Sequence, residues 1–257
     1  MENINEIYSK WYTNIYDRME EFREDVDLYL DMVGDKPVNI LEAACGSGRI
    51  LVPLAEAGHT VSGFDRNDKM LELIARKSSL SNLNCRQMDA IEGDWGSDYD
   101  IVIMGGNLLL NVEGVLPYED IQRLFISKAA KALKTGGHLI LEFGLFAHPE
   151  KIFAPNEGRL IYEGADASGV YGKFFVINTS YDSATQMASG SRRFDFTMPD
   201  GETASVYQTW AKHVPTLTQV HRWLRESGLE VEEEYGDFRR NPISETTDHA
   251  ILWSVLK

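Results

Sequence analysis

The sequence predicts an α/β fold: a mostly parallel sheet with helices on both faces, and a second, antiparallel sheet inserted late in the chain. The apolar run Val38–Leu41 is followed by a glycine pair and then by apolar residues at helical spacing. Strand-like and helix-like segments continue to alternate up to residue 147, as expected of a parallel sheet. From Arg159 to Ala211 the runs are of strand type only, with turn residues between them.

Composition narrows the functional classes. The chain has 257 residues, 43% of them hydrophobic, enough for one sizeable α/β domain with an insertion or for two small domains. Its formal net charge of −15 argues against nucleic-acid binding, which depends on clustered Lys and Arg, so a small neutral or cationic partner is expected. The two cysteines, Cys45 and Cys85, form no Cys-x-x-Cys pair and predict reduced thiols without a metal site. The absence of a signal-peptide pattern or a membrane-length apolar run predicts a cytoplasmic protein without a membrane partner.

The glycine pair Gly46 and Gly48 marks a strand–turn–helix unit within Val38–Arg49. Glycine lets the backbone turn tightly and approach a ligand, and the helix that follows offers unpaired N–H groups to an anionic group. Leu51 stands where a dinucleotide fingerprint requires a third small residue, and no Lys-Ser or Lys-Thr pair makes a phosphate loop. Both of those nucleotide-binding classes are therefore disfavoured.

Acidic residues end the predicted strands. Glu42 closes the first strand, and the second strand, His59–Phe64, is followed by Asp65. An acid about 20 residues beyond the glycines suits the hydroxyls of a ribose. Asp89 closes the third strand in the same way. A nucleoside-containing cofactor is the ligand that this series favours.

The series resembles the successive motifs of the class I S-adenosylmethionine-dependent methyltransferases, and is most similar to bacterial small-molecule and sugar N-methyltransferases. The motifs are Glu42-Ala-Ala-Cys-Gly-Ser-Gly-Arg49, Gly63-Phe-Asp65 with Met70-Leu71, and Met88-Asp-Ala90. The resemblance implies a Rossmann-like seven-stranded sheet with one antiparallel strand, the cofactor S-adenosyl-L-methionine with S-adenosyl-L-homocysteine as product, and no metal. The cofactor contacts that it implies come from Glu42, Ala43, Gly46, Gly48, Arg49, Asp65, Arg66, Met70, Met88, Asp89, Ala90, Gly105, Asn107 and Tyr16.

The remaining helices and strands are predicted from the spacing of apolar residues along the chain. Apolar residues at spacings of three and four predict helices within Ile4–Val33, at Asp68–Lys77 and Tyr118–Leu133, and from Thr216 or Thr218 through Leu224. The parallel sheet continues with strands at Val61–Phe64, Leu83–Met88, Tyr99–Met104, His138–Phe143, Leu229–Tyr235 and Ala250–Leu256. The inserted sheet takes its strands from Arg159–Glu163, Gly172–Tyr181, Ser189–Thr197 and Ala204–His213.

Two domains are expected. Residues 1–147 and 214–257 form the cofactor-binding domain, with the N-terminal helices as a lid. Residues 148–213 form the inserted sheet, which either covers the active site or makes an interface in a homodimer.

Candidate catalytic residues are less well defined than the cofactor contacts. Tyr12 and Tyr16 match loosely an N-terminal tyrosine that relatives place over the sulfonium, where an aromatic face attracts a cation. Asn107 follows the fourth strand, where the chain is expected to pass beneath the reacting methyl group. Glu142, at the end of the fifth strand, is a candidate to attract a protonated amine. His213 is the histidine considered as a candidate catalytic residue.

Methyl transfer from a sulfonium requires alignment of the reactants more than it requires an acid or a base. An amine nitrogen is slightly favoured as the acceptor, because an oxygen acceptor would call for a base or a metal and the sequence shows no compelling cluster for either. A small-molecule methyltransferase is therefore the leading interpretation. The alternatives are a catalytically silent protein of the same fold that binds S-adenosylmethionine or a nucleoside or serves in assembly and, less favoured, a nucleotide-sugar or dinucleotide oxidoreductase.

Overall fold

The computed structural model describes residues 3–19 and 21–257. The chain divides into two compact units. The smaller unit combines the N-terminal segment up to Glu21 with His148–His213, and the larger unit combines Phe22–Ala147 with Val214–Lys257.

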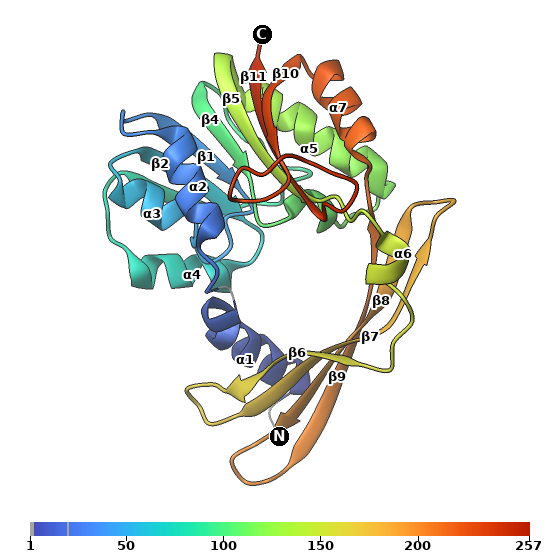
Figure 1. Ribbon diagram of the computed structural model, residues 1–257. Coiled ribbons are helices and arrows are strands. Elements are labelled where there is room, and N and C mark those ends of the chain that lie inside the picture. Colours follow the sequence, from blue (N-terminus) through green and yellow to red (C-terminus); the bar gives the residue numbers. More distant parts are fainter. Residues whose placement is uncertain (1–2, 20) are drawn as a thin grey trace. The chain divides into compact units, whose positions relative to one another are not determined.

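The larger unit is built on a seven-stranded sheet in the order β10-β11-β5-β4-β1-β2-β3 (Figure 1). Its strands are β1 (Asn39–Ala43), β2 (Thr60–Asp65), β3 (Leu83–Gln87), β4 (Tyr99–Met104), β5 (Leu133–Gly144), β10 (Leu229–Tyr235) and β11 (His249–Leu256). Neighbours from β3 through β5 pair in parallel, whereas β11 pairs antiparallel with both β5 and β10. The predicted α/β fold with one antiparallel strand is confirmed. The carboxyl ends of the parallel strands meet at one edge, where ligands bind in such sheets.

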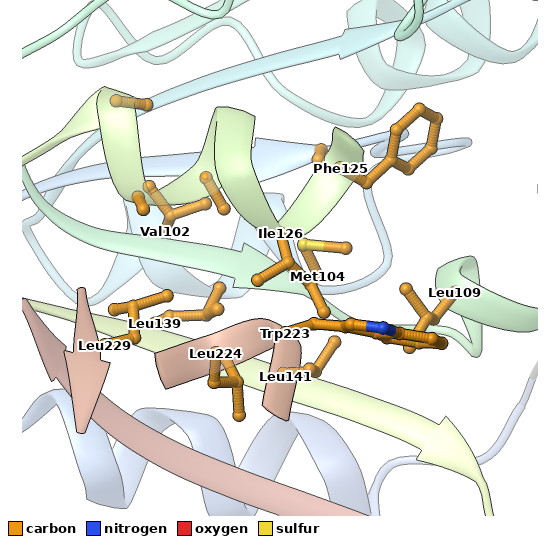
Figure 2. Close-up of a cluster of buried hydrophobic side chains, with 14 of the residues drawn as sticks. Val102, Met104, Leu109, Phe125, Ile126, Leu139, Leu141, Trp223, Leu224 and Leu229 are labelled. Carbon is orange, nitrogen blue, oxygen red and sulfur yellow. The ribbon is translucent and has the colours of Figure 1, made fainter. Parts of the chain in front are cut away.

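Helices cover both faces of this sheet (Figure 1). One face carries α2 (Glu24–Val33), α3 (Leu51–Glu56) and α4 (Asp68–Lys77), and the other carries α5 (Tyr118–Ala132) and α7 (Leu217–Glu226). Alternation along β4 divides the core, because Ile101 and Ile103 pack toward α2 and α3 whereas Val102 and Met104 pack toward α5 and α7. Figure 2 shows the apolar cluster on the face covered by α5 and α7, in which Trp223 of α7 lies beside leucines and a methionine of the sheet. Both faces of the sheet's interior are apolar, so the inner strands β4 and β11 read as nearly continuous hydrophobic runs.

Local signals set several boundaries. The side chain of Asn67 caps α4 by accepting from the backbone N–H of Lys69, and Thr216 caps α7 in a capping box with Gln219. The end of α5 differs from the prediction. The helix ends at Ala132, and Leu133 already pairs with Tyr99 as the first residue of β5. The residues between the predicted helix and the strand predicted at His138–Phe143 therefore belong to β5, whose pairing with β4 carries a register shift.

The smaller unit is a four-stranded antiparallel meander with one long helix against it. Its strands are β6 (Arg159–Ala165), β7 (Tyr171–Asp182), β8 (Met187–Thr197) and β9 (Thr203–His213), and its helices are α1 (Ile4–Met19) and the short α6 (Pro149–Ile152). Trp11 of α1 is fully buried against Phe194 and Phe196 of β8, and its Nε1 donates to the carbonyl of Gly164 at 3.1 Å. Gly172 makes room for this ring, since a Cβ there would lie 2.3 Å from Cε2 of Trp11.

The grouping of α1 with the inserted sheet differs from the domain division drawn from the sequence, which placed residues 1–147 together. The cause is visible in the aromatic residues of α1. They form a shared apolar cluster with β7, β8 and β9. The use of α1 as a lid over a cofactor stays a prediction, as does a homodimer through the inserted sheet.

Candidate functional site

The glycine turn connects β1 to α3 at the carboxyl edge of the sheet. Gly46 and Gly48 have φ angles of 52° and 78°, in the left-handed region that favours glycine. Ala44 has a φ of 54° without being a glycine, so the backbone here is held in a conformation that alanine rarely adopts. A Cβ on Gly48 would lie 2.9 Å from Cγ1 of Ile74, which explains the need for glycine in terms of packing as well. The turn was predicted, but the left-handed Ala44 was not.

Leu51, which stands where a dinucleotide fingerprint requires a small residue, is fully buried in the core of this face. The room comes from Gly63 on β2, where a Cβ would lie 2.8 Å from Cδ2 of Leu51 and 2.8 Å from Sγ of Cys45. Gly63 therefore permits close packing of helix and strand, the role that the third glycine has in a dinucleotide fingerprint.

Asp65 is held in place by the backbone on both sides. Its Oδ2 accepts the N–H of Gly46 at 2.9 Å, and its Oδ1 accepts the N–H of Asn67 at 2.8 Å. Hydrogen bonds to an ionised carboxylate are among the stronger ones in proteins. The same carboxylate thus fixes the glycine turn and stands half-buried at the end of β2, with lone pairs left for a ligand hydroxyl.

Glu42 is a buried acid with an unused oxygen. Its side chain is buried at the end of β1, and its Oε2 has no hydrogen-bond partner within the described part of the chain. Burial raises the pKa of Glu42 well above its usual range, while the positive charge of Arg49 acts in the opposite direction. A buried polar atom without a partner carries a free-energy penalty, and a polar ligand would remove it.

The two arginines of the predicted cofactor set already have acidic partners. Arg49 makes a bidentate ion pair with Asp25 of α2 at 2.6 and 2.7 Å, and Asp25 is 2% exposed. Arg66 forms an exposed pair with Glu113 at 2.8 Å. Arg49 therefore ties α2 to the glycine turn, and its predicted contact with the cofactor stays a prediction, as does that of Arg66.

The loop after β3 carries the predicted adenine contacts. Oδ1 of Asp89 accepts the N–H of Ile91 at 2.7 Å, which shapes the turn around Ala90. Lys128 of α5, which the sequence reading missed, donates to the carbonyls of Ala90, Ile91 and Gly93 at 2.9, 2.5 and 2.7 Å. One ammonium group with three donors thus holds this loop in shape. Burial lowers the pKa of Lys128.

Replacing Lys128 by Met is expected to loosen this loop and to weaken adenosine-containing ligands about tenfold, which corresponds to about 1.4 kcal/mol. The apolar stem remains, so the helix packing is kept while the three hydrogen bonds are lost. Calorimetric titration with S-adenosyl-L-homocysteine measures the change. Lys131→Met, on an exposed position of the same helix, is the matched control and should bind as the wild type does. Equal affinity in the two variants would contradict a role for Lys128 in shaping the site.

A second group of polar residues converges at the ends of β5 and β11. Glu142 is 3% exposed, and its Oε1 lies 2.5 Å from Nε2 of His249. Its Oε2 accepts the backbone N–H of Asn107 at 3.1 Å and the hydroxyl of Tyr29 at 3.4 Å. Asn107 adopts a left-handed backbone, and its Oδ1 accepts the N–H of Gly144 at 2.8 Å. Two predicted candidates, Asn107 and Glu142, are therefore in direct contact.

Tyr29 and His249 are the members of this group that the sequence reading missed. Burial and the nearby charge of Glu142 raise the pKa of Tyr29 well above its usual range, so its hydroxyl stays protonated and donates. Its ring lies over Gly105, where a Cβ would lie 3.2 Å from Cε2 of Tyr29. A histidine at the start of the last strand was the signal for His249, but its neighbour depends on the register that places His249 opposite Gly144.

The other predicted residues are placed as follows. Ala43 and Met70 are buried in the larger unit, and Met88 packs at the edge of its core. Tyr12 and Tyr16 lie on α1 with ring centres 5.9 Å apart, and His213 is buried on β9 with Nε2 3.3 Å from Oε1 of Gln186. These last three belong to the smaller unit. The place of Tyr12 or Tyr16 over the sulfonium and the candidate catalytic role of His213 stay predictions.

Among residues 3–19 and 21–257, no group of three or more His, Cys, Asp or Glu side chains is arranged to hold a metal ion. Among the same residues, no helix has the length and apolarity that a membrane crossing requires.

Comparison with known proteins finds similarity to methyltransferases. Residues 40–137 match the family described as a methyltransferase domain. A ubiquinone biosynthesis O-methyltransferase of Rhizobium leguminosarum bv. trifolii is 31% identical over 103 residues, which are 39% of this chain and 38% of that protein. The chain spans less than half the length of the first curated relatives that it matches.

Solved structures resemble the whole chain. An S-adenosylmethionine-dependent methyltransferase from Clostridium acetobutylicum superposes with a TM-score of 0.73 at 15% identity, covering 97% of this chain and 99% of that one. The sugar N-methyltransferase KedS8 from a Streptoalloteichus species gives a TM-score of 0.68 at 15% identity, covering 100% of this chain and 93% of that one. At such identities the likeness concerns the fold, and it includes the inserted sheet.

Proposed function

From a methyltransferase domain at residues 40–137 and a fold shared with S-adenosylmethionine-dependent methyltransferases over the whole chain, we propose that this protein binds S-adenosyl-L-methionine and methylates a small-molecule acceptor. The observation that carries this proposal is the set of polar groups at the carboxyl edge of β1, β2 and β3. Glu42, Asp65 and Asp89 stand there, each at the end of its strand or in the loop that follows, beside a turn with two left-handed glycines.

The residues at this edge suit the proposed cofactor in chemical type. The fixed carboxylate of Asp65 can accept from ribose hydroxyls, and Asp89 with Ala90 can receive the adenine. The unused Oε2 of Glu42 and the glycine turn suit the methionyl end, which carries an ammonium group. When bound, the cofactor supplies an electrophilic methyl group on a sulfonium, so the chain has only to align the acceptor and exclude water.

Nitrogen is the acceptor atom that we favour, with support from the neighbouring sugar N-methyltransferase. The curated relative from Rhizobium is named for oxygen methylation, so the comparisons point both ways. The acidic surface, with a net charge of −15, suits an acceptor that arrives as a cation, as a protonated amine does. A small amine therefore fits both the charge and the fold.

Calorimetric titration of the full chain with S-adenosyl-L-methionine and with S-adenosyl-L-homocysteine tests the proposed function. We expect heat of binding and an increase in Tm with both ligands at micromolar protein. Methylation of a panel of amines, hydroxyls and carboxylates then tests turnover. No heat and no thermal shift with either ligand would overturn the proposal, and binding without turnover of any acceptor would favour a catalytically silent nucleoside-binding protein.

Cofactor binding is expected to release a proton from Glu42. Because burial raises its pKa, Glu42 keeps its proton at pH values where an ordinary glutamic acid has lost it. A bound cation favours the carboxylate, so affinity should rise with pH up to the raised pKa and level off above it. Binding heats measured in phosphate and in Tris at one pH give the number of protons released.

Glu42→Gln should abolish this release, because the amide has no proton to lose in this range. The control is Glu72→Gln, on an exposed position of α4, which should keep the dependence on buffer. An unchanged buffer dependence in Glu42→Gln would mean that the released proton has another source.

A further inference from the structure

Glu142 is a buried acid that the proposed cofactor contacts do not use. It stands on the same face of β5 as the apolar residues packed toward α2, yet its two oxygens reach three partners from three other segments. These are Tyr29 of α2, the backbone of Asn107 after β4, and His249 at the start of β11. All of them belong to the larger unit. A buried carboxylate with this many donors is held in one position.

His249 is a member of this network whose side chain reaches solvent. Its side chain is 31% exposed, whereas that of Glu142 is 4% exposed. Pairing with Gly144 places His249 at the carboxyl edge of the sheet, directly beside the end of β5. The ring of Phe238 packs against it with centres 5.1 Å apart, which limits its rotation. An imidazole is thus presented at the edge where an acceptor would meet the methyl group.

The bond to Glu142 determines which ring nitrogen is available. A carboxylate only accepts hydrogen bonds, so we assign the proton in the 2.5 Å contact between Nε2 of His249 and Oε1 of Glu142 to Nε2. In the neutral ring the lone pair is then on Nδ1, which makes no hydrogen bond with the residues that the structure describes. A histidine whose ring is oriented by an acid in this way is the usual form of a general base.

Given the proposed function, we propose that His249 is a catalytic residue that accepts the proton lost by the methyl acceptor, and that Glu142 positions its ring. Nδ1 of His249 takes one proton from the ammonium form of the acceptor, and the N–H electron pair becomes the lone pair on nitrogen. That lone pair forms the new N–C bond as the S–C bond breaks, and the S–C electron pair stays on sulfur. The exposed ring of His249 passes the proton to water.

The sequence alone disfavours an oxygen acceptor, because it shows no compelling base. A base at His249 removes that reason. His249 with Glu142 would serve either atom, since both an amine and a hydroxyl have a proton to lose. The preference for nitrogen therefore rests on the negative net charge of the chain and on its structural similarity to a sugar N-methyltransferase.

The tautomer of His249 can be measured without any acceptor or cofactor. In nitrogen-15 spectra of the labelled full chain at alkaline pH, we expect the neutral His249 ring to carry its proton on Nε2. In Glu142→Gln the side-chain amide can donate as well as accept, so the preference for this tautomer should weaken. A wild-type ring with its proton on Nδ1 would overturn the assignment, because that nitrogen could not then accept another proton.

Kinetics with S-adenosyl-L-methionine and the amine that the wild type methylates fastest test the catalytic role. General-base catalysis typically contributes about 10²-fold or more, so His249→Ala should lower kcat by about that factor with little change in KM, and added imidazole should restore part of it. Glu142→Gln should lower kcat less, because the base remains. His138→Ala is the matched control: His138 also lies on this sheet, has a side chain 26% exposed, and pairs with Glu232 at 3.1 Å.

The outcomes separate this proposal from the proposed function. A wild-type chain that does not bind or turn over the cofactor would overturn the proposed function, whereas the tautomer measurement would still decide the state of His249. Wild-type turnover with an unchanged kcat in His249→Ala would overturn the catalytic role alone. The titration heat with S-adenosyl-L-homocysteine and the Tm of His249→Ala should stay near wild type, since a loss of either would indicate a structural role instead.

Discussion

Asp65→Ala is expected to lose at least about tenfold in affinity for S-adenosyl-L-methionine, the scale of lost hydrogen bonds to a charged group. Two effects act together. The variant removes the proposed acceptor for the ribose hydroxyls, and it also leaves the N–H of Gly46 without the Oδ2 atom that it contacts at 2.9 Å. The glycine turn then loses a fixed partner as well as the ligand contact. Calorimetric titration with the cofactor measures the combined loss of affinity from both effects.

Two controls separate these effects. Asp65→Asn keeps a side-chain oxygen for one backbone N–H but removes the charge, so its loss should be smaller than that of Asp65→Ala. Asp68→Ala changes an exposed acid in the first turn of α4, three residues further on, and should bind as the wild type does. Unchanged affinity in Asp65→Ala would mean that the end of β2 does not hold the ribose.

Trp11→Ala should have the largest effect on stability, a loss of about 3–5 kcal/mol in the free energy of unfolding of the smaller unit. The indole is fully buried between α1 and the strands, contacts Phe194 and Phe196, and donates to Gly164. Its removal leaves a cavity and removes one hydrogen bond to the carbonyl of Gly164. Urea unfolding followed by circular dichroism, with hydrogen exchange of α1, measures the loss.

Tyr207→Ala is the matched control for this variant. Tyr207 is an aromatic residue of the same unit with 63% of its surface exposed, so its truncation should change stability by about 0.5 kcal/mol or less. Similar losses in the two variants would contradict the packing described for Trp11. Cofactor affinity measured in Trp11→Ala also tests the predicted lid, because a lid made by α1 requires that helix to be ordered.

The parts of the site that the sequence could predict are those that follow from local order along the chain. A glycine turn after a strand, with acids at the ends of the next two strands, needs only the parallel arrangement to bring Gly46, Asp65 and Asp89 to one edge. The fold class was predictable for the same reason. Each strand–helix unit has its own periodicity, and the units pack in a way that few topologies allow.

The second half of the site depends on long-range register instead. Glu142 was recognisable as an acid inside an apolar strand, but its contact with His249 arises only from the antiparallel pairing of β11 with β5. The role of Lys128 could not be predicted from the sequence for a different reason. Its position on α5 looks like an ordinary half-buried helix position, and only the tertiary structure brings its ammonium group to the three carbonyls after β3.

The grouping of α1 was also beyond local patterns. Its aromatic residues fit any apolar surface, and the sequence holds no signal for which of two cores they join. Gly172 lies against a tryptophan of α1, but a glycine in a strand indicates such a contact only once the two residues are known to meet. In the same way, Gly63 indicates close packing with Leu51 only once these two residues are known to meet.

A crystal structure of the full chain with S-adenosyl-L-homocysteine tests the central claim most directly. The account predicts the ligand at the carboxyl edge of the seven-stranded sheet, with its ribose hydroxyls on the carboxylate of Asp65 and its adenine beside Asp89 and Ala90. A ligand bound elsewhere on the chain, or a ribose without contact to Asp65, would contradict it.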